Sequence, residues 1–71
     1  MPSLSKRVGQ TIARQRKLSH LTQAQVNLGI EVETVSRLET GTRPASLARL
    51  EQLGKLFGCP VVRFFVEDNG D

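Results

Sequence analysis

The sequence predicts an all-α fold, a compact bundle of four to five short helices. Apolar residues recur at helical spacing along most of the chain, and no alternating apolar and polar run is bounded by hairpin turn residues. A length of 71 residues is enough for one small domain with a single core. We therefore expect one domain over residues 1–66 and an acidic flexible tail, EDNGD, over residues 67–71.

The first predicted helix lies in the segment SLSKRVGQTIARQRKL, residues 3–18. Val8 and Ile12 are four residues apart with basic and polar residues between them, as on an amphipathic helix. Ser3 or Ser5 can cap the N-terminus, and we expect the helix to end near Leu18.

A second helix of about two turns is predicted in EVETVSRLETG, residues 31–41. Val35 and Leu38 share one face of this helix, and Gly41 ends it. Thr34 and Arg37 share a different face, so Arg37 is presented to solvent.

The strongest helical pattern is SLARLEQLGKLFG, residues 46–58. Five apolar residues repeat there at intervals of three or four: Leu47, Leu50, Leu53, Leu56 and Phe57. Ser46 is the expected N-cap and Gly58 the left-handed stop. Gly54 inside this helix costs about 1 kcal/mol relative to alanine, so we expect another helix to pack closely against it.

The segment after the strongest helix supplies most of the aromatic surface. Pro60 can open a last short helix, PVVRFFV, and we expect Phe57, Phe64 and Phe65 to be core residues or in part a dimer contact. Cys59, beside Pro60, is expected to be a small buried apolar group.

The composition excludes several classes of protein. Cys59 is the only cysteine and His20 the only histidine, so neither a disulfide within the chain nor a zinc cluster is expected. No catalytic constellation can be assembled, and we expect neither an enzyme nor a cofactor. The chain starts at Met1 with neither a membrane-spanning run nor a secretory leader, which predicts a cytoplasmic protein without membrane partners.

Positive charge is concentrated in the front half of the chain. Residues 1–43 hold seven Lys or Arg against three Glu, a net charge of +4, and residues 44–71 hold three against four, a net charge of −1. The whole chain carries +3. This asymmetry is typical of a protein that presents one face to a polyanion.

Three segments together resemble one family. They are LTQ at 21–23, GIEVETVSRLETG at 29–41 and RPASLARLEQLGKLFGCP at 43–60, and they are similar to the helix-turn-helix domain of the Cro and phage-repressor (Cro/C1-type) transcriptional regulators. The resemblance covers about residues 4–65. It implies five packed helices, of which the second crosses the DNA backbone and the third, about residues 31–39, lies in the major groove.

The resemblance also implies a function. It points to a repressor-like regulator, encoded by a bacterium or a phage, that binds double-stranded DNA as a homodimer and uses no small-molecule substrate. Nine positions match the family pattern for DNA contact: Gln23, Val32, Glu33, Thr34, Ser36, Arg37, Thr40, Thr42 and Arg43. Among these, Gln23 matches a phosphate-binding glutamine. Arg37 is the best candidate for reading a base, because arginine forks onto O6 and N7 of guanine.

Two glutamates at the start of the third helix, the one expected in the major groove, complicate this assignment, because their carboxylates repel the DNA phosphates. A negative charge at a helix N-terminus is stabilised by about 0.3–1 kcal/mol, which favours a capping role for Glu31. The role of Glu33 stays open, since a glutamate can also accept a hydrogen bond from cytosine N4. Separately, Arg16 and Glu39 match an ion pair that ties the first and third helices together in several relatives.

The expected second helix is two residues shorter than the family pattern T-Q-x-x-L-A-x-x-L-G. Two helical residues correspond to ~200° of rotation and ~3 Å of rise, so only one end of the helix can keep its usual place. In the first register, Thr22 is the N-cap, Gln25 closes a capping box, Gln23 faces a phosphate and Val26 enters the core.

In the second register, Leu21, Ala24 and Leu28 form an apolar stripe and Ser19 is the cap. A third alternative is that the short connection forces helices to exchange between two chains in a swapped dimer. His20 replaces a glycine that the family often has here, which raises the strain of a left-handed turn.

A protein-interaction function is the alternative to DNA binding. In this interpretation the chain is an antitoxin-like module whose DNA surface is impaired by the short second helix. Exposed apolar residues of the segment VVRFF, residues 61–65, would then contact the partner.

Overall fold

The computed structural model describes residues 3–26 and 31–66. This part of the chain contains three α-helices, two short 3-10 helices and no strand: α1 (Leu4–Leu18), η1 (Gln23–Gln25), α2 (Val32–Thr40), α3 (Leu47–Phe57) and η2 (Val61–Phe65). The all-α class is confirmed, but the predicted count of four to five helices is not exact, because two of the five segments are short 3-10 helices. The tail over residues 67–71 and Leu28 lie outside the described residues.

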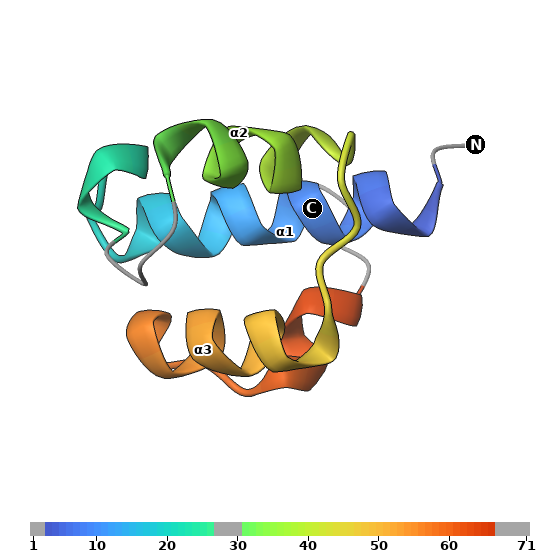
Figure 1. Ribbon diagram of the computed structural model, residues 1–71. Helices are drawn as coiled ribbons and strands as arrows, with labels where there is room; N and C mark the ends of the chain where they lie inside the picture. The colour runs from blue at the N-terminus through green and yellow to red at the C-terminus, as the bar shows by residue number, and fades with distance from the viewer. Residues whose placement is uncertain (1–2, 27–30, 67–71) are drawn as a thin grey trace.

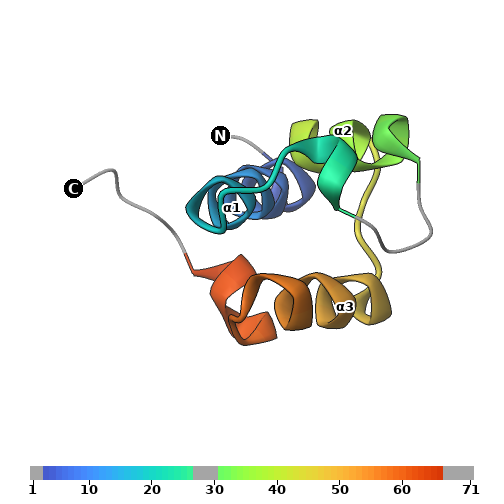
Figure 2. The same cartoon turned by 90° about the vertical axis from the view of Figure 1, so that its left-hand side faces the viewer.

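Helix α1 is the central element of the bundle. Figure 1 shows α2 on one side of it and α3 on the other, and η2 follows α3 and packs back against α1. The view in Figure 2 shows the same arrangement along α1. Eight apolar side chains of the described residues form the core: Val8, Ile12, Val26, Val35, Leu38, Leu50, Leu53 and Phe64. None of the helices in the described part is long and apolar enough to cross a membrane.

The helix ends follow local chemistry. The Ser3 hydroxyl accepts a hydrogen bond from the Lys6 amide at the start of α1, and the Ser46 hydroxyl accepts one from the Arg49 amide at the start of α3. Gly58 ends α3 in the left-handed conformation, with φ of 71°. These ends confirm the predicted caps.

The close approach predicted at Gly54 is made mainly by backbone. A Cβ added there would lie 2.7 Å from the carbonyl oxygen of Cys59 and 3.8 Å from the Phe64 ring. The chain turning back after α3 fills this space, together with one ring from η2. The expected neighbour was another helix, and the closest contact is instead the connection to η2.

A second close approach, at Gly9 of α1, was not predicted. A Cβ at Gly9 would collide with the carbonyl oxygens of Leu38 and Glu39, the latter at 2.7 Å, so α1 and α2 pack backbone to backbone here. The sequence contained a signal for this close packing, because Gly9, like Gly54, is a glycine inside a helical pattern.

We expect Gly9→Ala to destabilise the domain by about 1–3 kcal/mol, because the added methyl group must push α1 away from α2. At an open helical site the same change stabilises, by up to about 1 kcal/mol. Urea unfolding followed by circular dichroism measures the difference, and Gln10→Ala on the exposed side of α1 is the matched control. A Gly9→Ala variant more stable than the wild type would contradict the close packing.

The C-terminal segment is a 3-10 helix with Pro60 at its N-cap position. Phe64 is fully buried, and its ring meets the half-buried ring of Phe57 edge to face, with centroids 6.5 Å apart. Phe65 is 46% exposed and is therefore not a core residue. Cys59 is only partly buried, although it packs against the core as predicted.

Candidate nucleic-acid interface

The short segment between α1 and α2 adopts the first predicted register. The Thr22 hydroxyl accepts from the Gln25 amide at 3.2 Å, and Gln25 Oε1 accepts from the Thr22 amide at 2.8 Å, which completes the capping box. Val26 follows and is 2% exposed. The resulting helix is a three-residue 3-10 turn, η1, rather than an α-helix.

The second register is wrong at the residues that the structure describes. Ser19 is the C-cap of α1 and does not cap the next helix, and Ala24 is exposed rather than part of an apolar stripe. The alternative in which helices exchange between two chains stays a prediction. His20 lies just before this segment with φ of 59°, the left-handed turn that the sequence predicted.

Gln23 faces the protein rather than open solvent. Its Nε2 donates to Glu39 Oε1 at 3.0 Å, and its side chain is partly buried. A phosphate contact of Gln23 stays a prediction: one N–H of its amide is already bound to an internal carboxylate, and the second is left for a phosphate.

Arg16 and Glu39 form the ion pair that the resemblance implies. Arg16 Nε donates to Glu39 Oε2 at 2.6 Å and Nη2 donates to Oε1 at 3.2 Å, a two-point contact between α1 and α2. Arg16 Nη1 also donates to the carbonyl of Leu21 at 2.7 Å. The two side chains are 11% and 7% exposed. Together with Gln23, this cluster fixes the positions of α1, the turn and α2 relative to one another.

Helix α2 has a buried face and an exposed face. Val35 and Leu38 point into the core, whereas the side chain of Arg37 is 55% exposed and that of Glu33 is 74% exposed. Arg37 Nη2 lies 3.8 Å from Glu33 Oε2, one helical turn away, so the two exposed side chains form a surface ion pair. The predicted presentation of Arg37 on the outer face agrees with this geometry.

The loop after α2 folds back onto the end of the helix. Gly41 has φ of 79° and its amide donates to the carbonyl of Leu38. The Arg43 amide donates to the carbonyl of Arg37 at 3.2 Å, and the hydroxyls of Thr40 and Thr42 are hydrogen-bonded to each other at 2.9 Å. The chain reversal therefore brings the exposed threonines and Arg43 next to the C-terminal end of α2.

The predicted DNA-contact residues on α2 and its following loop fall into two groups by exposure. Six are exposed: Val32, Glu33, Arg37, Thr40, Thr42 and Arg43. Thr34 and Ser36 are half-buried. The six exposed residues belong to one continuous stretch of chain and form the candidate interface.

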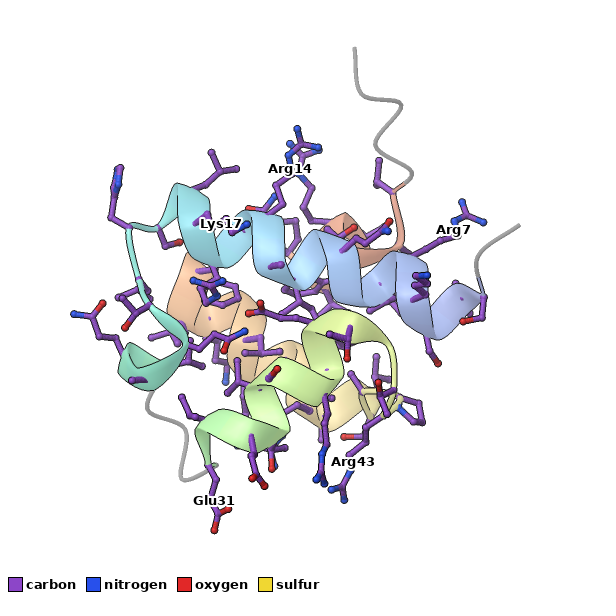
Figure 3. All side chains as sticks on the ribbon, turned by 90° about the horizontal axis from the view of Figure 1, so that it is seen from above. Arg7, Arg14, Lys17, Glu31 and Arg43 are labelled. Carbon is purple, nitrogen blue, oxygen red and sulfur yellow. The ribbon has the colours of Figure 1, made fainter. Side chains whose placement is uncertain are left out.

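Charge on this face is divided along α2. Glu31 and Glu33 lie at the N-terminal end, and Arg37 and Arg43 at the C-terminal end. Glu31 occupies the N-cap position, but its side chain makes no capping hydrogen bond, so only the helix dipole stabilises it there. Figure 3 shows Glu31 and Arg43 projecting from the α2 side of the bundle.

The positive excess of the front half does not lie on α2. Three cations, Arg7, Arg14 and Lys17, project from α1 on the side of the bundle away from Glu31 and Arg43 (Figure 3). The sequence predicted one basic face, but the structure divides the cations between the α1 side and the C-terminal end of α2.

The described residues contain no group of three His, Cys, Asp or Glu side chains that could hold a metal ion. Burial raises the pKa of the Cys59 thiol above its usual value, and nearby Arg63 lowers it by less, so the thiol stays protonated at neutral pH and is a poor nucleophile.

Comparison with known proteins agrees with this geometry. A search of curated proteins finds no match to the chain. The family described as "Helix-turn-helix domain" matches residues 7–64, which run from the first turn of α1 to Phe64 of η2. This span is most of the chain and includes the whole candidate interface. The protein therefore belongs to the helix-turn-helix domain family, and this membership indicates a DNA-binding regulator.

Proposed function

We propose that the protein is a sequence-specific, repressor-like transcriptional regulator that inserts α2 into the major groove of double-stranded DNA. The observation that carries this proposal is the orientation of α2, whose apolar face is buried while the exposed face holds Val32, Arg37 and the start of the polar loop. The major groove is about 12 Å wide and admits one α-helix. The Arg16–Glu39 ion pair holds α2 against α1, so the exposed face is presented by a fixed scaffold.

Each exposed side chain of the interface suits a different contact. The guanidinium of Arg37 can donate to O6 and N7 of guanine, and Val32, which is 46% exposed, can pack on the methyl group of thymine. Arg43 and the hydroxyls of Thr40 and Thr42 lie at the end of α2, where they can bind phosphates along one strand. Thr34 and Ser36 are half-buried and contribute at the edge of the contact.

The 3-10 turn η1 takes the place of the helix that normally crosses the DNA backbone. Its amide groups remain close to α2 because Gln23 is bound to Glu39. We propose that η1 makes fewer phosphate contacts than a full second helix would, so that more of the binding free energy comes from α2 and the loop after it.

We further propose that two copies bind together as a homodimer. Dimers of helix-turn-helix modules contact half-sites about 34 Å apart, so the binding site is expected to be nearly palindromic. Val62 on η2 is 64% exposed and offers an apolar contact between copies. Sedimentation velocity with the selected duplex measures the stoichiometry, and a complex containing a single copy would contradict the homodimer.

The direct test selects a site from a pool of randomised duplexes and then titrates that duplex, followed by fluorescence anisotropy, at several salt concentrations. Sequence-specific binding requires an affinity for the selected duplex at least 10³-fold above that for a scrambled duplex. The log of the affinity should fall linearly with the log of the salt concentration, because bound phosphates release counterions. Absence of binding at low salt would favour the protein-interaction alternative, for which Val62 and Phe65 are the exposed apolar residues of VVRFF.

We expect Glu33→Gln to raise the affinity for all duplexes a few-fold. The Glu33 carboxylate is 74% exposed at the N-terminal end of α2, where it repels the phosphates. Its ion pair with Arg37 is exposed, so its loss changes the free energy of unfolding by less than about 1 kcal/mol. Glu51→Gln on the exposed side of α3 is the control. A loss of affinity on Glu33→Gln would mean that this carboxylate orients Arg37 or accepts from cytosine.

A further inference from the structure

The start of α1 packs against the loop that follows α2, and both lie at the same end of the bundle (Figure 1). A Cβ added at Gly41 would lie 2.5 Å from the Cα of Lys6 and 3.0 Å from its Cβ. The two segments are therefore in direct contact, and the side chain of Lys6 leaves α1 beside Gly41. Glycine is needed at this position twice, for the close approach and for the positive φ of 79°.

Gly41 lies between the two threonines whose hydroxyls are hydrogen-bonded to each other. The Thr40 hydroxyl also donates to the carbonyl of Arg37 at 3.2 Å. Because a hydroxyl has one proton, Thr40 must accept the 2.9 Å hydrogen bond from Thr42. Both protons are thus used within the loop. A phosphate at this position must break one of these hydrogen bonds to reach a hydroxyl proton, whereas a cation can bind it directly.

Two cations flank this loop. Arg43 follows Thr42 along the chain, Lys6 approaches from α1, and both residues are exposed. The four-carbon stem of lysine is flexible, so the Lys6 ammonium can move over the loop. The acidic residue next to the loop, Glu39, is bound by Arg16 and its side chain is only 7% exposed, so it does not offer its charge at this surface. The loop end of the interface is therefore positive.

We propose that Lys6 is a further phosphate-binding residue, which extends the DNA interface from the loop after α2 onto the start of α1. This inference rests on the proposed function, because it requires α2 to lie in the major groove. The loop then follows one strand of the DNA backbone, and Lys6 binds a phosphate next to the one that Arg43 contacts. A contact from α1 compensates in part for the phosphate contacts that the short turn η1 does not make.

The test titrates the selected duplex and a scrambled duplex with Lys6→Gln at several salt concentrations. Loss of one phosphate contact should weaken binding about five- to tenfold at ~0.1 M salt and make the slope of log affinity against log salt shallower by about 0.9. The loss should be equal for the two duplexes, because a phosphate contact carries no sequence information. Lys6→Arg should bind as the wild type does. Lys55→Gln removes the same charge from the last turn of α3 and should leave the slope unchanged.

A second measurement locates Lys6 on the DNA. An iron–EDTA chelate attached to Lys6→Cys in a Cys59→Ala background should cleave the selected duplex on the same backbone segment as the chelate attached to Arg43→Cys. The chelate on Lys55→Cys should leave that segment intact.

The results that would overturn this contact differ from those that would overturn the proposed function. Wild-type binding with an unchanged slope for Lys6→Gln, or cleavage from Lys6→Cys no stronger than from Lys55→Cys, would overturn the contact alone. So would a loss that Lys6→Arg shares, because the charge would then not be its cause, and a loss confined to the selected duplex, because Lys6 would then read a base. Absence of wild-type binding at low salt would overturn the contact and the proposed function together.

Discussion

Replacing Glu39 with leucine is expected to destabilise the domain by about 3–5 kcal/mol, the largest effect of any single change considered. The change leaves the guanidinium of Arg16, which is 11% exposed, without its carboxylate partner. Gln23 loses its acceptor at the same time. Urea unfolding followed by circular dichroism gives the difference in the free energy of unfolding.

The double variant Arg16→Met/Glu39→Leu separates the ion pair from the packing around it. With both charges removed, no buried charge is left unpaired, and the double variant should recover most of the stability that Glu39→Leu loses. Glu33→Gln is the control, because it breaks the exposed ion pair with Arg37 within α2. It should change the free energy of unfolding by less than about 1 kcal/mol. A loss below about 1 kcal/mol for Glu39→Leu would show that the cluster does not hold α1 and α2 together.

Replacing Arg37 with alanine is expected to weaken binding to the selected duplex by about 1–3 kcal/mol and to relax specificity at one base pair. The side chain is 55% exposed on the outer face of α2, and the change removes the planar fork that can bind guanine. Anisotropy titration against a panel of duplexes, each with one substituted base pair, measures both effects. The fold is expected to be unaffected, because the side chain of Arg37 and its ion pair with Glu33 lie on the surface.

Arg43→Ala is the matched control for Arg37→Ala. Arg43 lies in the loop after α2, so its loss should weaken binding to all sequences evenly and reduce the slope of log affinity against log salt by about 1. Arg37→Lys keeps the positive charge but loses the planar guanidinium. Compared with Arg37→Ala, it should restore the affinity for DNA more than the specificity for one base pair. An even loss over the whole panel for Arg37→Ala would refute the base-reading role.

The helix boundaries were predictable from sequence because they depend on neighbouring residues. A serine before an amphipathic run supplies an acceptor for the third amide, as Ser3 and Ser46 do. Gly41 and Gly58 end their helices because glycine adopts positive φ without a Cβ clash. The inward positions of Val35 and Leu38 followed from helical spacing alone.

The connection between α1 and α2 was only partly predictable. Local chemistry supports the capping box of Thr22 and Gln25, and an apolar spacing of three and seven residues supports the competing stripe. The first register is observed because Val26 finds space in the core and Gln23 reaches Glu39, a partner sixteen residues away. Helical spacing relates residues within one helix and does not indicate contacts between residues so far apart in the sequence.

The sequence by itself determined the all-α class, the helix ends and the pairing of Arg16 with Glu39, the last through resemblance. The tertiary structure decided where each surface points: it buried one N–H of Gln23 against a carboxylate, pressed Gly9 onto the backbone of α2 and placed most of the basic excess on α1. These features depend on how rigid helices cross one another. The crossing is fixed by the shape of the whole core, whereas caps and stops are fixed within one turn of chain.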